Sequence, residues 1–186
     1  MDDNTPHRKY PRATFLDYSF GNFFVTICTH EKKHYFGCIH QGEMHPSAIG
    51  CFLAENIQSV RTHYPNVEIL NYVVMPNHVH LIVSVADGAN ESARTAGNLG
   101  RLNQLARMSG ATGCDPILTT HHNSRLAVVV GGIKAATTRF ARKNGIEFGW
   151  QSRFHDHLIR GPRDGDNIWD YINNNIATWE KDCFYI

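Results

Sequence analysis

Residues 72–85 constrain the fold most strongly, because two short apolar runs are separated there by a Pro-Asn turn. Both runs are rich in β-branched residues, which predicts two consecutive β-strands. Side chains alternate across a strand, so Val79 and Leu81 share one face while His78 and His80 share the other. We therefore expect the valine-leucine face to pack into the core. The two imidazoles should project together from the opposite face.

The spacing of this histidine pair suits metal binding. Two residues along a strand are roughly 6.6 to 7 Å apart at the backbone, so the ring nitrogens of His78 and His80 can converge on one cation. Neutral imidazole is the commonest metal ligand in proteins. Two ordinary surface histidines would give the same pattern, so the pair alone does not choose between these readings.

Hydrophobic periodicity predicts an alternating series of strands and helices. Strands are expected over 22–29, 35–39, 67–75, 78–85 and 153–160, and helices over 47–63, 126–143 and from 166 towards 179. This order fits an α+β fold of the ferredoxin-like kind, an antiparallel sheet with helices on one face. The two histidines would then face the last helix.

The chain length of 186 residues fits one domain with embellishments. We expect an N-terminal arm over 1–20, a single domain over 21–182 and a tail over 183–186. Within the domain, 87–124 is a long segment of low hydrophobicity, which predicts a mobile insertion. A short helix is possible within it, over 99–108.

Composition excludes several classes of protein. No apolar run approaches the ~20 residues of a membrane span, and the N-terminus lacks the pattern of a signal peptide. Five cysteines without paired spacing argue against a disulfide framework and against a zinc module. The expected location is the cytoplasm, with no membrane partner.

Charge is distributed unevenly although the net charge is only +1. Between residues 101 and 163 the basic residues outnumber the acidic ones, whereas acids gather in the flanking segments. A basic half of this kind is typical of a phosphate-binding surface. An ordinary solvated helix face is the alternative, and charge alone leaves both open.

Three sequence blocks together resemble one known family. They are MPNHVH at 75–80, GWQSRFHDHLIR at 149–160 and DYINNN at 170–175. They resemble, in the same order, the motifs of REP-associated tyrosine transposases, which are single-tyrosine HUH endonucleases related to insertion-sequence transposases. The match covers most of 20–182. Ile176 stands where that family usually has proline.

This resemblance implies a set of functional residues. Tyr171 would be the nucleophile that forms a 5′-phosphotyrosine with DNA, and His78, His80 and Asn175 would hold a divalent metal, Mg²⁺ or Mn²⁺. Tyr171 and Asn175 are four residues apart, so they share one face of the last helix. A second pair, His155 and His157, is a rival for the metal.

The resemblance also implies the partner, single-stranded or hairpin DNA. Basic residues outside the three metal ligands would contact its phosphates, which position a strand without reading its sequence. The candidates are Lys134, Arg139, Arg142, Arg153 and Arg160, together with Arg8, Lys9 and Arg12 in the arm. Insertion-sequence relatives form dimers and REP-associated ones can be monomers, so the resemblance leaves both states open, with a homodimer as the expectation.

Two other functions remain open from the sequence. A histidine-dependent phosphoesterase of the His-x-His-x-His type would need a third histidine where this chain has Ile82. A catalytically degenerate protein that binds hairpin DNA or RNA on the same fold is the other, and Ile176 is compatible with it.

Overall fold

The computed structural model describes residues 20–86 and 124–185. Arg8, Lys9 and Arg12 of the expected arm lie outside these ranges. So do the helix expected over 99–108 and nearly all of the 87–124 insertion.

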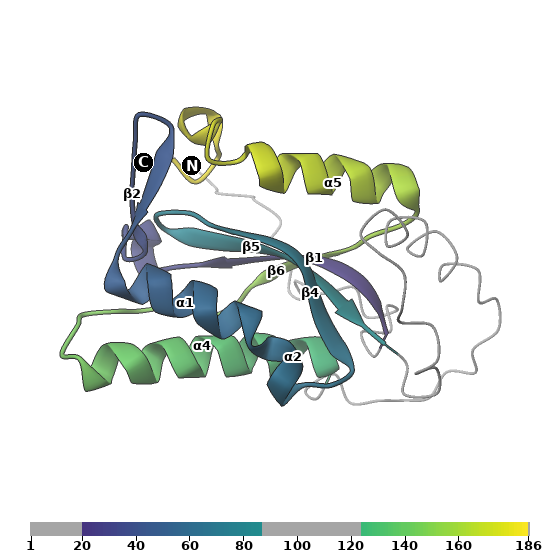
Figure 1. Cartoon of the computed structure of the whole chain (residues 1–186), viewed down its shortest axis with the longest axis horizontal. Coiled ribbons are helices and arrows are strands. Elements are labelled where there is room, and N and C mark those ends of the chain that lie inside the picture. Colours follow the sequence, from purple (N-terminus) through teal and green to yellow (C-terminus); the bar gives the residue numbers. More distant parts are fainter. Residues whose placement is uncertain (1–19, 87–123, 186) are drawn as a thin grey trace, which may run out of the picture.

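The centre of the fold is a four-stranded antiparallel sheet with the strand order β4-β5-β1-β6 (Figure 1). Its elements follow the chain in the order β-α-β-β-α-β, which is the ferredoxin-like arrangement. These are β1 (Gly21–Cys28), α1 (Ala48–Gln58), β4 (Val67–Val74), β5 (His78–Val85), α4 (Arg125–Lys143) and β6 (His155–Leu158). The α+β antiparallel fold expected from the sequence is confirmed.

The two faces of the sheet carry different layers. Helices α1 and α4 cover one face, as expected, and pack on Phe23, Val25 and Leu81 in the larger core. Helix α5 (Pro162–Asn174) lies on the opposite face, where Ile82 and Ile172 belong to a smaller core (Figure 1). The helices therefore do not all cover one face, because α5 is amphipathic and buries its own apolar side on the histidine face.

Strand register explains this division. In β5 the odd-numbered residues from Val79 to Val85 point to the larger core, and His78, His80 and Ile82 point to the smaller one. A one-residue slip of β5 would exchange the two sets and bury the histidines among α1 and α4. The predicted division of this strand into an apolar and a histidine face is therefore confirmed.

A second, two-stranded sheet precedes α1. Strands β2 (Gly37–His40) and β3 (Glu43–Pro46) form a hairpin whose two turn residues, Gln41 and Gly42, both have positive φ. This backbone geometry suits a tight hairpin turn, and Gly42 adopts it without a steric penalty. The sequence predicted the first of these strands but not the second.

The helix expected over 47–63 is interrupted once. Ser47 caps α1 by accepting a hydrogen bond from the Gly50 N–H, and a break at Ser59 separates α1 from α2 (Val60–His63). The last helix begins earlier than expected, because Gly161 has a φ of +87° and Pro162 occupies the first helical position. The helix ends at Asn174, before the short turn η3 (Trp179–Lys181).

Within the part of the chain that is described, no helix is long and apolar enough to cross a membrane.

Candidate functional site

The paired histidines of β5 are buried at the interface between the sheet and α5. His78 is 0% exposed and His80 is 1% exposed. Their Nε2 atoms are only 3.0 Å apart, so the two rings converge on one point, as the strand spacing predicted. The sequence could not show that both rings are withdrawn from solvent.

Hydrogen bonds to the other ring nitrogen fix the orientation of each imidazole. The Asn77 side chain donates through Nδ2 to the Phe184 carbonyl (2.9 Å), which leaves its Oδ1 as an acceptor for His78 Nδ1 (2.8 Å). Neutral His78 therefore carries its proton on Nδ1 and a lone pair on Nε2. His80 Nδ1 is 2.8 Å from the Thr26 hydroxyl of β1. Partners of this kind behind imidazole ligands are typical of metal sites.

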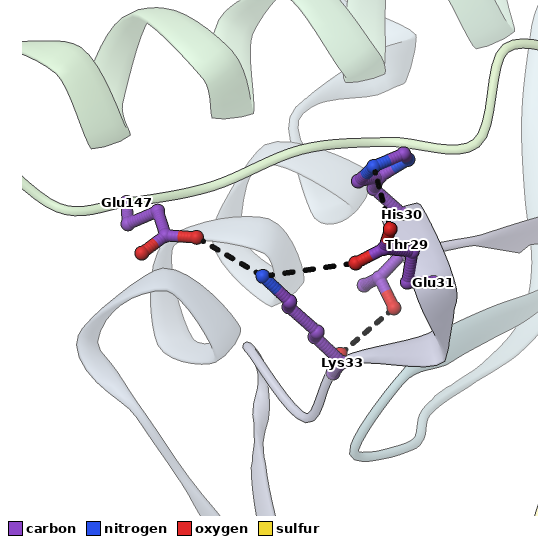
Figure 2. Close-up of polar contacts among 5 residues, drawn as sticks. All are labelled: Thr29, His30, Glu31, Lys33 and Glu147. Atoms are coloured by element: carbon purple, nitrogen blue, oxygen red, sulfur yellow. Dashed lines mark hydrogen bonds and ion pairs between the residues drawn. The ribbon is translucent and has the colours of Figure 1, made fainter.

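A tight turn after β1 holds Asn77 in place. The backbone N–H of Thr29 donates to the Asn77 carbonyl (2.9 Å), and the Thr29 hydroxyl lies 2.8 Å from the Lys33 carbonyl. Figure 2 shows this turn, in which the Lys33 ammonium reaches Glu147 at 3.2 Å and Glu31 at 3.8 Å. Glu31 has a φ of +53°, so these contacts stabilise a backbone conformation that is uncommon outside glycine.

Helix α5 brings the predicted nucleophile to the histidines. The hydroxyl of Tyr171 lies 3.2 Å from His80 Nε2 and 3.2 Å from Asp182 Oδ2, and its side chain is 40% exposed. Asn175 sits one turn later, is 1% exposed, and donates through Nδ2 to the same Asp182 oxygen at 3.2 Å. Tyr171, Asn175 and both histidines are thus gathered in one place.

Asp182 is the site residue that sequence reasoning missed. It follows η3, where the chain turns back over the histidines, and Phe184 then packs on His78 with ring centroids 4.5 Å apart. No motif marks Asp182, and its position depends on a turn that carries no sequence signal. Phe184, within the segment expected as a tail, packs against the site in the structure.

The protonation of the site follows from burial. Burial, together with the charge of its neighbour His80, holds the pKa of His78 well below its usual value, and burial lowers the pKa of His80 to about 4. Both imidazoles are therefore neutral at pH 7, the form that binds metals. Burial and the negative charge of Asp182 raise the pKa of Tyr171 to about 12.

The residues present fit a divalent cation. The ligand atoms of His78, His80 and Asp182 all lie within 4.8 Å of one another. Among the described residues, the buried Oδ1 of Asn175 has no hydrogen-bond partner, and an unpaired buried oxygen costs about 1–3 kcal/mol. A cation beside it would remove that cost. The donor set of two imidazoles, one carboxylate and one amide oxygen suits Mn²⁺ better than Mg²⁺.

The basic residues expected to contact DNA divide into two groups. Lys134, Arg139 and Arg142 lie on α4, which covers the opposite face of the sheet, and the Lys134 ammonium donates to the Gln151 carbonyl (2.6 Å). Arg153 and Arg160 are exposed and flank β6 on either side in the sequence. The structure therefore places only the second group beside β6, the strand next to β1, whose Thr26 and Phe24 contact His80.

The rival histidine pair lies on the same sheet face but on β6, which is separated from β5 by β1. His155 pairs with Thr26 and His157 pairs with Phe24, both of which contact His80. Both rival histidines are exposed, and His157 Nε2 donates to Asp164 at 2.9 Å. Their nitrogens do not converge with a carboxylate as those of the buried pair do, which favours His78 and His80 as the ligands.

Comparison with known proteins gives one relative over the full sequence. A Haemophilus influenzae protein of uncharacterized function is 29% identical over 182 residues, covering 97% of this chain and 94% of that protein. No family model matches the sequence.

Solved structures similar to this chain include one from Deinococcus radiodurans and one of a REP-associated tyrosine transposase. A Deinococcus radiodurans protein aligns over 88% of this chain and 95% of its own length with 11% identity, but its TM-score of 0.43 is too low for an argument. A REP-associated tyrosine transposase, solved bound to a REP hairpin, aligns over 90% of this chain and 72% of its own with 19% identity and a TM-score of 0.55. The chain therefore has the fold of a REP-associated tyrosine transposase, and the resemblance seen in its motifs is confirmed at the level of the fold.

Proposed function

We propose that this protein is a metal-dependent DNA strand transferase that cleaves and rejoins single-stranded DNA beside a hairpin through a 5′-phosphotyrosine at Tyr171. One observation carries the proposal. The partly exposed phenol of Tyr171 lies 3.2 Å from His80 Nε2, which is itself 3.0 Å from His78 Nε2, and both histidines are buried and neutral. A tyrosine with only a structural role would not need two neutral histidines beside its hydroxyl.

In the proposed reaction, the phenolic oxygen of Tyr171 attacks a backbone phosphorus in line with the bond to the 3′-oxygen. The Oη–P bond forms as the P–O3′ bond breaks, so no bond energy is lost to hydrolysis. The phenolic proton passes to the Asp182 carboxylate, which already accepts a hydrogen bond from it. The released 3′-oxygen takes up a proton from solvent. Reversal with another 3′-hydroxyl rejoins the strand without ATP.

Burial and the charge of Asp182 determine the protonation state of the nucleophile in the metal-free site. With a pKa of about 12, the phenol of Tyr171 stays protonated at pH 7. A divalent cation held by His78, His80, Asp182 and the Asn175 oxygen would polarise the scissile phosphate and stabilise the negative charge on the departing oxygen. The hydrogen bond that His78 donates to Asn77 and the one between His80 and Thr26 keep both rings aimed at that point.

The choice of DNA as substrate is supported by three things. The three motif blocks resemble REP-associated tyrosine transposases, a structure with this fold was solved on a REP hairpin, and exposed arginines flank β6. Tyr171 must reach one backbone in line, so the cleaved segment has to be single-stranded.

The test is a search for a covalent protein–DNA adduct. DNA hairpins with single-stranded tails of randomised sequence are incubated with the protein and Mn²⁺, and adducts that survive SDS are isolated and sequenced. We expect adducts with the wild type, none in EDTA and none with Tyr171→Phe. The matched control is Tyr185→Phe, which removes an exposed phenol nearby in the chain and should leave adduct formation unchanged.

Other outcomes would identify the competing functions. Cleavage that continues in Tyr171→Phe without any adduct would make the protein a hydrolase. Hairpin binding without cleavage by the wild type would make it a binding protein.

A further inference from the structure

The half of the histidine face that belongs to β1 and β6 is partly open, beside the nucleophile. We define the shelf as Phe24, His155 and His157. Phe24 of β1 pairs with His157 of β6, and Thr26 pairs with His155. The side chains of Phe24, His155 and His157 therefore lie on the same face of the sheet. Helix α5 packs mainly on β4, at the other side of this face, and both histidines of the shelf remain exposed.

Phe24 links the shelf to the reacting groups. Its ring stacks on His80 with centroids 5.1 Å apart and an interplanar angle of 26°, and meets the Tyr171 ring edge-on at 6.0 Å. Phe24 is only half-buried, so part of this residue remains accessible to solvent. An aromatic ring in this position offers a stacking surface to any planar group that enters with a phosphate.

The far end of the shelf is fixed by α5 itself. Asp164 in the first turn accepts hydrogen bonds from His157 Nε2 (2.9 Å) and from the Arg160 backbone N–H (2.8 Å). Asp164 precedes Tyr171 by seven residues, or two helical turns, so both lie on the same side of α5 about 10 Å apart. At about 3.4 Å for each stacked base, that length accommodates two or three nucleotides.

Charge favours a polyanion on the shelf. Arg153 and Arg160 are exposed at the two ends of β6. Of the nearby acids, Asp164 accepts two hydrogen bonds at the edge of the shelf, and Asp156 pairs with Val25, which places it on the other face of the sheet.

From these contacts we infer that the shelf binds the single-stranded nucleotides next to the scissile phosphate, with one base stacked on Phe24. The inference rests on the proposed strand cleavage and names where the substrate strand lies. Proteins that bind single strands without sequence preference combine basic residues that contact the nucleic-acid backbone with aromatic rings that stack on the bases. Binding of this kind requires no base-specific contact on the shelf, so recognition of the sequence would come from elsewhere.

The experiment places the fluorescent base 2-aminopurine at successive positions of the thymidine tails of a DNA hairpin. Fluorescence and affinity are measured by titration without cleavage, in EDTA. We expect quenching at one or two adjacent positions on one side of the hairpin with the wild type and with Phe24→Tyr, which keeps the ring. With Phe24→Leu the quenching should disappear and the Kd should rise about tenfold, within the range measured for one stacked base.

The matched control is Phe140→Leu. Phe140 stacks on Phe52 at a centroid distance of 4.2 Å, on the helices that cover the opposite face of the sheet, so its loss should leave quenching and Kd unchanged. Quenching that persists in Phe24→Leu would overturn the inference, as would no quenching at any tail position or equal losses in both variants.

Failure of the inference and failure of the proposed function give different results. Adduct formation at Tyr171 without base stacking on Phe24 would remove the shelf and leave the cleavage reaction. Ring-dependent stacking without any adduct would retain the shelf as a strand-binding surface and remove the reaction.

Discussion

Burial of the histidine pair makes the stability of the metal-free protein depend on pH, and His80 gives the magnitude. Its pKa is about 4 in the folded chain, against an ordinary value of 6.5 for an exposed imidazole. The unfolded chain therefore binds a proton near pH 6.5 that the folded chain refuses until about pH 4. Stability contributed by neutral His80 is fully present above pH 6.5 and is lost as the pH falls through this window.

One group of this kind changes the free energy of unfolding by about 1.4 kcal/mol for each pH unit inside the window. Between pH 6.5 and pH 5, His80 should therefore account for a loss of about 2 kcal/mol. That is a large part of the roughly 5–15 kcal/mol that stabilises a typical domain. His78 acts in the same direction, because its pKa is also lowered.

The assay is urea unfolding in EDTA at pH 5, 5.5, 6 and 6.5, with wild type, His80→Gln and His45→Gln. Glutamine keeps a polar group but cannot titrate. The decrease in the free energy of unfolding between pH 6.5 and pH 5 should therefore be about 2 kcal/mol smaller in His80→Gln than in the wild type. His45 is exposed on β3, and its replacement should leave the wild-type difference intact. Equal pH dependence in wild type and His80→Gln would refute the reasoning.

Three further predictions concern single side chains. Thr26→Val removes the hydroxyl partner of a site histidine and should weaken Mn²⁺ binding about 10- to 100-fold by calorimetry, whereas unchanged affinity would mean that the hydroxyl does not orient the ring. Asp182→Asn should weaken Mn²⁺ binding by a similar factor, and tight binding in that variant would exclude its carboxylate as a ligand. Gly132→Ala should destabilise the fold by about 1–3 kcal/mol, because the new Cβ would collide with the Tyr64 hydroxyl. Gly131→Ala should stabilise the fold by roughly 0.5–1 kcal/mol, because its new Cβ would meet only open space. Equal melting temperatures of the two variants would contradict this prediction.

Much of the fold was predictable from local pattern. Alternation along 78–85 fixed which side of β5 faces the larger core, since only one register buries Val79 and Leu81. The spacing of Tyr171 and Asn175 placed both on one side of a helix, and the structure brings both to the histidines. These features depend on periodicity, which a sequence shows directly.

Other features depend on contacts distant in sequence and were not predictable. Asp182 reaches the site only because the chain reverses after α5 and Phe184 packs on His78. Lys134 looked like a free cation, but the fold uses its ammonium to bind the Gln151 carbonyl. The second strand of the β2–β3 hairpin was missed because Glu43 to Pro46 is short and polar, and backbone pairing rather than side-chain pattern defines it.

The most direct test of the central claim is mass spectrometry of the protein after reaction with hairpin DNA and Mn²⁺. Trypsin releases residues 164–181 as one peptide, and Tyr171 is the only tyrosine in it. After nuclease digestion we expect this peptide to carry the mass of a 5′-linked nucleotide on Tyr171. A nucleotide on another peptide, or cleaved DNA with no modified peptide, would contradict the assignment of Tyr171 as the nucleophile.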